Sequence, residues 1–479
     1  MWPFSRKKEA PALPSVFFTN TLSGRKERFI PHKAGTVSMY TCGPTVYSRQ
    51  HIGNLRPGIV ADTIARTLEG AGYRVRRVMN ITDVGHLTDD GDQGEDKVAK
   101  GARLEKTTPE AIAKRYALQF IADLDEVGVR TEDIRFPRAT EYVKEQIALA
   151  KTLEEKGFTY ATRDGLYFDT QKFSNYGALG NVGHAELLPG KRVAMGEKKS
   201  ANDFALWRAA KPNDLQQWDS PWGTGNPGWH LECSTMARVL LGEQIDIHTG
   251  GEDLAMIHHN DEIAQSEAAS GRQFVRYWLH NAFLTMGGEK VSKSLGNVVY
   301  LSDLTEKGFH PLALRYFFLQ AHYRTPLSFG WDALAAADEA LRRLWTRALE
   351  VIAEAKASEG SEARDRFLAH MRDDLATPQA LSVLWEALRS DENTPEELRG
   401  LLEVADVHLG LSLLSPPKIV RKFAAEDAPV DIRALAEARD AARAKKDFAE
   451  ADRLREELET RGYRVEDSAE GTVLAKRRG

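Results

Sequence analysis

Residues 42–58, with the sequence CGPTVYSRQHIGNLRPG, decide the fold of this chain because a strand ends where they begin and a helix follows them. Residues Thr36–Thr41 alternate as in a strand, and Gly43–Pro44 ends that pattern. Helical spacing runs over residues 59–68, and a second strand is predicted over residues 74–82. A strand, a helix and a strand within about 45 residues predict a βαβ unit of a parallel sheet.

The same pattern returns much later in the chain. A strand is predicted over residues 244–248, a helix over 261–269 and a strand around 274–282. Between these two parts the sequence is irregular, with short helices, a hairpin predicted in YATRDGLYFDT and turns in WDSPWGTGNPGW. We therefore expect an insertion that divides one sheet into two halves in sequence.

The part of the chain after Gly330 is predicted to be almost entirely helical, with apolar residues at helical spacing and charged outer faces. Four helices that would form a bundle are expected at 332–355, 362–372, 378–389 and 395–405. Beyond Pro416–Pro417, a small terminal module is expected to contain helices at 431–444 and 447–460 and a hairpin of 464–465 with 472–475.

These elements predict an α/β fold, in which a Rossmann-like parallel sheet is split by an insertion and followed by a helical bundle and a small α+β module. The predicted divisions are a first half of the sheet at 17–136, the insertion at 137–227, a second half of the sheet at 228–300, a linker at 301–331, the bundle at 332–415 and the terminal module at 416–479.

Composition limits the classes of protein to which the chain can belong. Its 479 residues suggest about three or four domains. With 42% hydrophobic and 28% charged residues it is typical of globular proteins. We expect a cytoplasmic protein with no membrane partner, because no stretch reaches the ~18 apolar residues of a membrane span and the start lacks a secretory signal core. A net charge of −5 excludes a uniformly basic surface for nucleic acid but permits local patches.

The chain has two cysteines, Cys42 and Cys233, each in a segment rich in Gly, Pro, His and aromatic residues. In a reducing compartment such thiols more often bind metals or react than form crosslinks, although two buried packing thiols are the alternative. His258 and Glu262 are four residues apart and would share one face of a helix. A Cys, Cys, His and Glu set has the softness that zinc prefers, with His259 as a competing ligand.

Two short motifs are candidates for phosphate binding. His51 and Asn54 lie in HIGN at the approach to a helix, where free backbone N–H groups and the helix dipole favour phosphate. Lys290 and Lys293 lie in GGEKVSKSLGN, a loop composition that suits mobile cations around a polyphosphate. Each motif alone could be a helix cap or a solvated surface loop.

The order of HIGN and KVSKS around one split sheet resembles the paired signatures of class I aminoacyl-tRNA synthetases. Longer motifs narrow the resemblance to the cysteinyl-tRNA synthetases, from about Phe17 to the C-terminus. These motifs are MNITDVGHLTDDGDQGEDK, DFALWRAAKP, GWHLECSTMA, GGEDL and HHNDEIAQSE. The chain departs from the common pattern of that family at Val291, where relatives often have Met, and at Met256–Ile257.

The resemblance implies a complete set of site residues. Zinc, one ion per chain, would be held by Cys42, Cys233, His258 and Glu262. ATP, with Mg²⁺, would be bound by His51, Asn54, Gly250, Gly251, Asp253 and Lys293. Catalysis would use His51, Asn54, Lys290 and Lys293, and the substrate pocket would include Cys42, Thr82 and Trp229.

The function that the resemblance implies is ATP-dependent activation of L-cysteine to cysteinyl-adenylate and transfer to the 3′ end of tRNA(Cys). The helical bundle and the terminal module would bind the tRNA, and the protein would be a monomer. Candidate phosphate contacts are Arg342, Arg343, Arg421, Lys422 and residues 476–478. Two alternatives remain: a paralogous ligase that transfers cysteine to an amino-sugar acceptor, and a non-catalytic paralogue that binds zinc or RNA.

Overall fold

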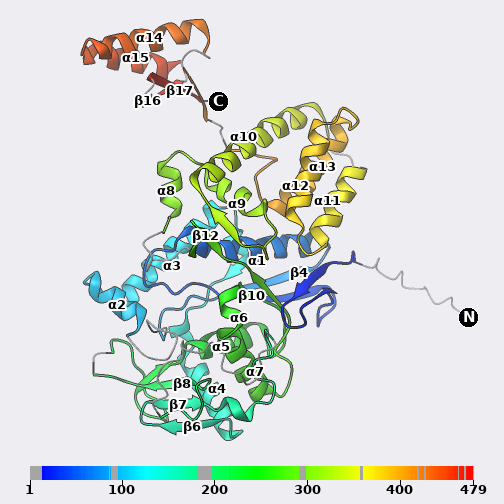
Figure 1. The fold of residues 1–479 in the computed structure, drawn as a ribbon, viewed down its shortest axis with the longest axis vertical. Coiled ribbons are helices and arrows are strands. Elements are labelled where there is room, and N and C mark those ends of the chain that lie inside the picture. Colours follow the sequence, from blue (N-terminus) through cyan, green and yellow to red (C-terminus); the bar gives the residue numbers. More distant parts are fainter. Residues whose placement is uncertain are drawn as a thin grey trace, which may run out of the picture. The chain divides into compact units, whose positions relative to one another are not determined.

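The structure of the chain, a computed structural model, describes residues 13–85, 87, 95–180, 197–212, 214–287, 289–290, 298–356, 360–417, 420–424, 428–461, 463–468 and 471–477. The chain divides into two compact units. Unit 1 comprises Met1–Leu341 and Glu350–Leu411, and unit 2 comprises Arg342–Leu349 and Ser412–Gly479. Figure 1 labels the helices and strands of both.

A five-stranded parallel sheet forms the centre of unit 1, with the strand order β11-β10-β3-β4-β5. Strand β3 comes from the first half of the chain and pairs directly with β10 from the second half, so the prediction of a sheet split in sequence is confirmed. The strands are β3 (Thr36–Thr41), β4 (Arg74–Met79), β5 (Ile134–Arg135), β10 (Ile245–Gly251) and β11 (Val275–Asn281).

Helix α1 (Ile52–Gly70) follows β3. The apolar spacing predicts a start at residue 59, but the helix begins at Ile52. Pro57 lies inside the helix and cannot donate a backbone hydrogen bond there. The early turns are nevertheless held by tertiary contacts. Ile52 and Leu55 are fully buried, and the Ile52 N–H donates to the carbonyl oxygen of Val299 at 2.9 Å. Packing therefore outweighs the tendency of proline to disrupt the interior of a helix in this segment.

Two further helices in the first half were not predicted, although both carry clear start signals. Asp96 caps α2 (Lys97–Leu104) by accepting from two backbone N–H groups, and Thr108 caps α3 (Pro109–Glu126), which has Pro109 at its first position. The remaining short elements are β1 (Phe17–Asn20), β2 (Arg25–Arg28), η1 (Thr131–Asp133) and η2 (Ala139–Tyr142).

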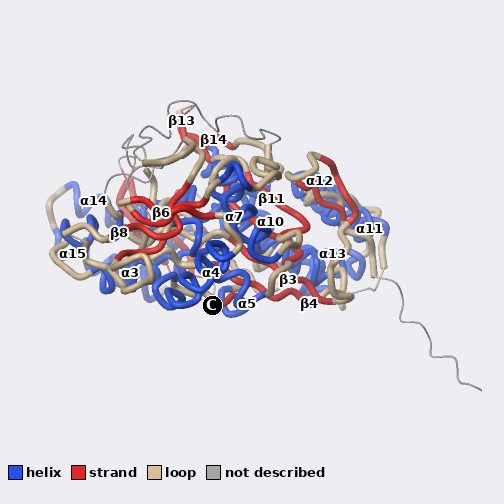
Figure 2. Tube along the Cα trace, turned by 90° about the horizontal axis from the view of Figure 1, so that it is seen from below, coloured by secondary structure: helices blue, strands red, loops and turns tan. Residues whose placement is uncertain are grey.

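The insertion is an antiparallel sheet of four strands in the order β6-β7-β8-β9, preceded by helix α4 (Val143–Glu155). The predicted hairpin is formed by β6 (Thr159–Thr162) and β7 (Gly165–Phe168). It is followed by η3 (Thr170–Lys172), β8 (Phe204–Ala209) and β9 (Gly225–Pro227). Figure 2 labels β6 and β8, two of these strands, in red. Phe168, Phe204 and Trp207 bury this sheet in a core shared with α4 and the later helix α5.

Three helices of the second half surround the end of the central sheet: α5 (Trp229–Leu241), α6 (Glu252–Ala255) and α7 (His258–Ser270). They are followed by a small sheet of β12 (Leu284–Met286), β13 (Glu289–Lys290) and β14 (Leu327–Phe329), in the order β13-β12-β14. Helices α8 (Leu301–Glu306) and α9 (Pro311–Leu319) lie between β13 and β14 in the chain.

The predicted bundle helices are present as α10 (Trp331–Glu354), α11 (Glu362–Arg372), α12 (Thr377–Arg389) and α13 (Pro395–Leu409). Within unit 1, α11, α12 and α13 pack against one another, as Figure 1 shows in yellow and orange, and α13 also packs against α1.

In unit 2, α14 (Val430–Ala444) and α15 (Phe448–Thr460) confirm the two predicted helices, and β16 (Tyr463–Ser468) pairs with β17 (Gly471–Arg477) as the predicted hairpin. A third strand, β15 (Val420–Ala424), was not predicted and pairs with β17. The core of this unit is formed by Ile432, Ala436, Leu458, Tyr463 and Leu474.

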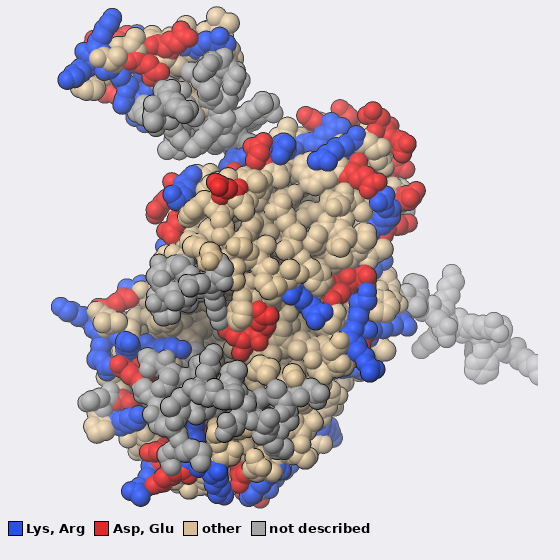
Figure 3. Space-filling view, viewed as in Figure 1, with Lys and Arg blue, Asp and Glu red and all other residues tan. Residues whose placement is uncertain are grey.

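The described surface carries charges of both signs. On the face shown in Figure 3, Lys and Arg side chains alternate with Asp and Glu side chains around a broad uncharged area.

None of the helices in the described ranges has both the length and the apolar character needed to cross a membrane.

Asp62 is fully buried and is the centre of a charge cluster in unit 1. Its carboxylate accepts from Arg66 at 2.6 Å, from Arg77 at 3.1 Å and from Arg315 at 2.8 Å. Arg315 also donates to the carbonyl oxygens of Gly128 and of Leu409, the last residue of α13. The cluster therefore joins α1, α9 and the end of the bundle through Asp62 and Arg315, which are both removed from water.

His408 gives this same contact between α1 and α13 a pH dependence. The side chain is 2% exposed, its Nδ1 donates to the carbonyl oxygen of Val404 at 2.7 Å, and a Cβ at Gly70 would lie 2.5 Å from its Nε2. Burial lowers the pKa of His408 to about 4. The unfolded chain would bind a proton at about pH 6.5, so this part of the stability is complete above that pH and is lost as the pH falls toward 4.

We expect unfolding in urea to show a loss of up to about 3 kcal/mol from this group between about pH 6.5 and pH 4. The variant His408→Gln should lack that part of the pH dependence, because it has no group that titrates in this window. Equal pH dependence in the two proteins would contradict the assignment to His408.

Candidate zinc and nucleotide site

The four predicted zinc ligands come from three elements that meet at the carboxyl ends of β3 and β10. Cys42 directly follows β3, Cys233 lies in α5, and His258 and Glu262 lie on one face of α7. Cys42 is held in place because its N–H donates to the carbonyl oxygen of Thr249 in β10 at 3.0 Å. Residues that are far apart in sequence are thus brought together by the split sheet.

Their ligand atoms form one compact group, all within 4.8 Å of one another. Cys42 Sγ lies 3.9 Å from Cys233 Sγ and 3.7 Å from Glu262 Oε1, and His258 Nε2 lies 3.1 Å from the same carboxylate oxygen. Cys233, His258 and Glu262 are at most 2% exposed.

The electrostatics of this group are those of an anionic ligand set. Burial would raise the pKa of Cys233, but hydrogen bonds with Cys42 and His258 outweigh it and lower the pKa to about 6. Burial would lower the pKa of His258, yet the contacts with Cys233 and Glu262 raise it to about 10. Burial raises the pKa of the Cys42 thiol. A proton on His258 therefore balances negative charge that a divalent cation could balance instead.

The donor set fits zinc. Two thiol sulfurs, one imidazole nitrogen and one carboxylate oxygen match the ligands and the number that zinc uses in proteins. Leaving a carboxylate and a thiolate buried without a cation would be costly, because burial penalises unpaired charge. The group has this donor set and is buried, so a zinc ion would fit its ligands and balance its charge. Its members are Cys42, Cys233, His258 and Glu262.

A second group of four shares Cys42 and Glu262 but uses His248 and His259, and these atoms also lie within 4.8 Å of one another. His259 Nε2 is 3.3 Å from Cys42 Sγ, and His248 Nε2 is 3.1 Å from Glu262 Oε2. The alternative of His259 as a ligand thus keeps a geometric basis. The set with His258 contains both cysteine sulfurs, which are soft ligands, and it therefore fits zinc better.

The structure adds supporting residues that sequence analysis missed. His230 Nδ1 lies 2.8 Å from His258 Nδ1, and its Nε2 lies 3.2 Å from Asp261, which also accepts from the Tyr176 hydroxyl at 2.6 Å. Partners of this kind fix the ring orientation of a metal-binding histidine. His230 lies in the same GWHLEC motif as Cys233, so its place in the sequence could have identified it.

Two other missed histidines lie near the carboxyl ends of parallel strands, where sites in such sheets usually form. His248 in β10 is paired with Tyr40 of β3, and His280 in β11 is paired with Gly250. His280 Nε2 lies 2.7 Å from His259 Nδ1. Their positions on predicted strands were the available signal.

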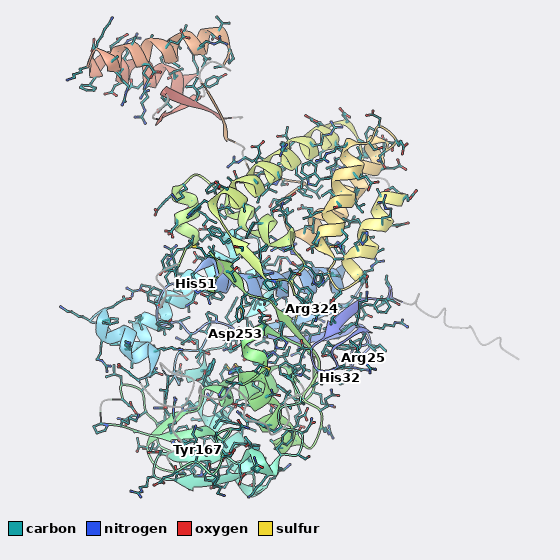
Figure 4. The ribbon with its side chains drawn as sticks, viewed as in Figure 1. Arg25, His32, His51, Tyr167, Asp253 and Arg324 are labelled. Carbon is teal, nitrogen blue, oxygen red and sulfur yellow. The ribbon has the colours of Figure 1, made fainter. Side chains whose placement is uncertain are left out.

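His51 and Asn54 are at the N-terminal end of α1, as expected. His51 is the residue before the helix, and its N–H donates to Asn54 Oδ1 at 3.2 Å. A Cβ at Gly53 would lie 3.0 Å from His51 Nδ1, so glycine makes room for that ring. Figure 4 labels His51 here and Asp253 on α6.

Gly250 and Gly251 end β10 and lead into α6, which carries Asp253. A Cβ at Gly250 would lie 2.9 Å from the His259 ring, and one at Gly251 would lie 2.5 Å from Asp253 Oδ1. Both glycines therefore allow side chains of the site to approach the strand closely.

The two remaining predicted pocket residues are Trp229, which contacts the zinc group, and Thr82. The Trp229 ring centroid lies 4.4 Å from that of His258. Thr82 is buried, accepts from the side-chain amide of Asn80 at 3.1 Å, and is bridged to Thr45 beside the Cys42 turn. Of the two lysines, Lys290 is described as backbone in β13 and its side chain is not, whereas Lys293 lies outside the described residues, as does Val291.

Comparison with protein families finds two matches in this chain. Residues 28–339 match the family described as tRNA synthetases class I (C) catalytic domain. Residues 425–472 match the Cysteinyl-tRNA ligase anticodon binding domain. The first match alone covers more than half of the sequence.

Relatives match over nearly their whole length. The chain is 47% identical to Cysteine–tRNA ligase 1 of Burkholderia lata over 465 residues, which covers 95% of this chain and 96% of the relative. It is 42% identical to Cysteine–tRNA ligase of Chlorobium chlorochromatii, covering 95% of this chain and 98% of the relative.

Solved structures support the fold at much lower identity. A methionyl-tRNA synthetase of Mycobacterium tuberculosis superposes with a TM-score of 0.54 at 18% identity, covering 80% of this chain and 91% of that chain. A LeuRS of Agrobacterium radiobacter gives 0.58 at 12% identity, covering 81% and 86%. The class I catalytic match, the anticodon-binding match and the near full-length relatives agree, and the chain therefore belongs to the cysteinyl-tRNA synthetase family of cysteine–tRNA ligases.

Proposed function

We propose that this cysteine–tRNA ligase activates L-cysteine with ATP and transfers the cysteinyl group to tRNA(Cys), using its buried Cys/Cys/His/Glu group to select the amino acid. In the first step the cysteine carboxylate attacks the α-phosphorus of ATP, and pyrophosphate leaves as cysteinyl-adenylate forms. In the second step a ribose hydroxyl at the tRNA 3′ end attacks the acyl carbon, and AMP leaves. The observation that carries the proposal is the compact group of Cys42, Cys233, His258 and Glu262.

These four residues would hold zinc, which when bound supplies a centre that prefers a thiolate sulfur over a hydroxyl oxygen. Selection of this kind is needed because cysteine and serine differ by one atom, and pocket shape alone discriminates by only about 10- to 200-fold. Trp229, beside the His258 ring, and the buried Thr82 would form the walls that orient the substrate at the metal.

The nucleotide would lie at the start of α1. His51 and Asn54 would bind its phosphates there, where the helix N-terminus favours anions. Gly250 and Gly251 end strand β10 and Asp253 follows it in α6, and these three residues would bind adenosine. Mg²⁺ would accompany ATP, and Lys290 and Lys293 would offset the charge that develops on the leaving pyrophosphate.

No side chain needs to act as a nucleophile in either step. The substrate carboxylate and the ribose hydroxyl supply the attacking atoms, so the chain contributes orientation and fixed charge. The anticodon-binding family match at 425–472 supports tRNA(Cys) as the acceptor and gives no support to an amino sugar. We propose that the basic residues of the terminal region contact the tRNA backbone.

Charging of tRNA(Cys) with labelled cysteine, beside an amino-sugar acceptor under the same conditions, tests the proposed acceptor. We expect cysteinyl-tRNA to form and no cysteine to be transferred to the sugar. Transfer to the sugar without charging of tRNA(Cys) would contradict the proposal.

A further inference from the structure

Arg56 is a buried cation in α1 that lies one helical turn after Ile52, and the proposed mechanism gives it no role. Its side chain is 1% exposed. It forms no ion pair with any residue in the described ranges of the chain, although the carboxylate of Glu252 lies near enough to act on its pKa. Burial lowers the pKa of Arg56 to about 10, so the group remains a cation at neutral pH.

The guanidinium donates instead to four backbone carbonyl oxygens. One nitrogen, Nη1, donates to Ala282 and Phe283, each at 2.7 Å. The other, Nη2, donates to Thr325 at 2.8 Å and to Tyr323 at 3.4 Å. These acceptors lie just before β12 and β14, so Arg56 fixes the point at which both strands of the small sheet begin.

Glu252, the first residue of α6, holds the same junction through a second side-chain contact. Its Oε1 accepts from the N–H of Phe283 at 2.9 Å, and the Phe283 carbonyl oxygen also accepts from the N–H of Leu327 at 3.1 Å. Phe283 is therefore fixed by the side chains of Arg56 and Glu252 and by the neighbouring strand β14. A backbone site constrained this fully has little freedom to shift.

The junction leads directly to one of the proposed phosphate-binding lysines. Strand β12 begins after Phe283 and pairs with β13. In this pairing, Thr285 of β12 is the partner of Lys290 of β13. The other proposed phosphate-binding element is His51, which immediately precedes α1. Arg56 therefore lies on the helix that directly follows His51 and is hydrogen-bonded to the backbone just before β12, the strand that pairs with the Lys290 strand.

We propose that Arg56 is a positioning residue, which fixes the β12–β13 hairpin against the His51 end of α1 so that both elements can act on the triphosphate during cysteine activation. The inference rests on the proposed roles of His51 and Lys290. It predicts an effect on the first chemical step alone, because the second step transfers the acyl group after pyrophosphate has left.

The test is Arg56→Lys, in which an ammonium group cannot span both pairs of carbonyl oxygens as the planar guanidinium does. We expect kcat for cysteine-dependent ATP–pyrophosphate exchange to fall about 10- to 100-fold, as for a small misplacement of a catalytic group. The KM for cysteine, the zinc content and the rate of transfer from preformed cysteinyl-adenylate to tRNA(Cys) should be unchanged.

A matched control is Arg399→Lys. Arg399 in α13 also donates to two backbone carbonyl oxygens, those of Ile352 and Ala355, but lies outside the proposed site. We expect this variant to exchange at the wild-type rate. If Arg56→Lys slows activation and transfer equally, or slows neither, the inference is wrong.

Two further variants keep the test decisive. Glu252→Ala removes the second side-chain support of Phe283 and should also slow exchange, even if Arg56→Lys does not fold. Normal exchange in Glu252→Ala would contradict the inference. Combining Arg56→Lys with Lys290→Ala should cost less than the product of the separate effects, whereas a full product would contradict positioning of Lys290. Absence of exchange in the wild-type protein would instead overturn the proposed function.

Discussion

Replacing Cys233 by serine is expected to release zinc from the purified protein and to abolish selective activation of cysteine. The substitution removes one of two sulfurs from a buried group in which Cys42, His258 and Glu262 are the other proposed ligands. Loss of a supporting residue alone typically weakens a metal site about 10- to 100-fold, and loss of a ligand should cost more. Zinc content by mass spectrometry and cysteine-dependent ATP–pyrophosphate exchange would measure both effects.

The neighbouring variant Ser234→Ala provides the control, because Ser234 is buried on the same helix and belongs to neither candidate metal group. It should retain zinc and exchange activity. The circular dichroism of Cys233→Ser should remain that of a folded protein, since serine conserves the shape of the side chain. Stoichiometric zinc with normal activity in Cys233→Ser would show that the site is misassigned.

Asp62→Asn is expected to have the largest effect on stability, lowering the free energy of unfolding by about 3–5 kcal/mol. Asp62 is fully buried and pairs with four arginines, and Arg315 and Arg77 would be left buried without a full negative partner. The midpoint of unfolding in urea measures the loss. Exposed pairs are worth far less, about 0–1 kcal/mol, so Glu386→Gln, which breaks the pair with Arg366, is the control.

The same cluster should respond to acid. Burial would raise the pKa of Asp62, but Arg315, Arg66 and Arg77 outweigh burial and hold the pKa well below its usual range. The stability that this group contributes is therefore present above the unfolded pKa of about 4 and is lost as the pH falls below it. The difference between the wild type and Asp62→Asn should shrink in that range. An equal difference at neutral and at strongly acid pH would contradict this account.

The sequence was sufficient to predict the split sheet, because both halves repeat a strand–helix–strand pattern whose elements are marked by apolar spacing and glycine. It also singled out the four residues of the buried Cys/Cys/His/Glu group, since two cysteines in 479 residues stand out and the spacing of His258 and Glu262 is helical. Local sequence patterns are informative where the residues of an element are enough to determine its structure.

Features that depend on distant partners could not be predicted in this way. The start of α1 ahead of Pro57 depends on a hydrogen bond from Ile52 to Val299, and the Asp62 cluster depends on Arg315. Strand β15 becomes a strand because it pairs with β17 at the end of the chain. The role that we assign to Arg56 likewise becomes visible only when residues near 56, 283 and 325 are brought together.

The central claim is that the buried Cys/Cys/His/Glu group selects the amino acid in an ATP-dependent ligase. ATP–pyrophosphate exchange by the zinc-loaded protein, measured with cysteine and with serine as the only amino acid, tests it most directly. The account predicts exchange with cysteine and none above background with serine. Equal exchange with both amino acids, or none with cysteine from protein that contains zinc, would contradict it.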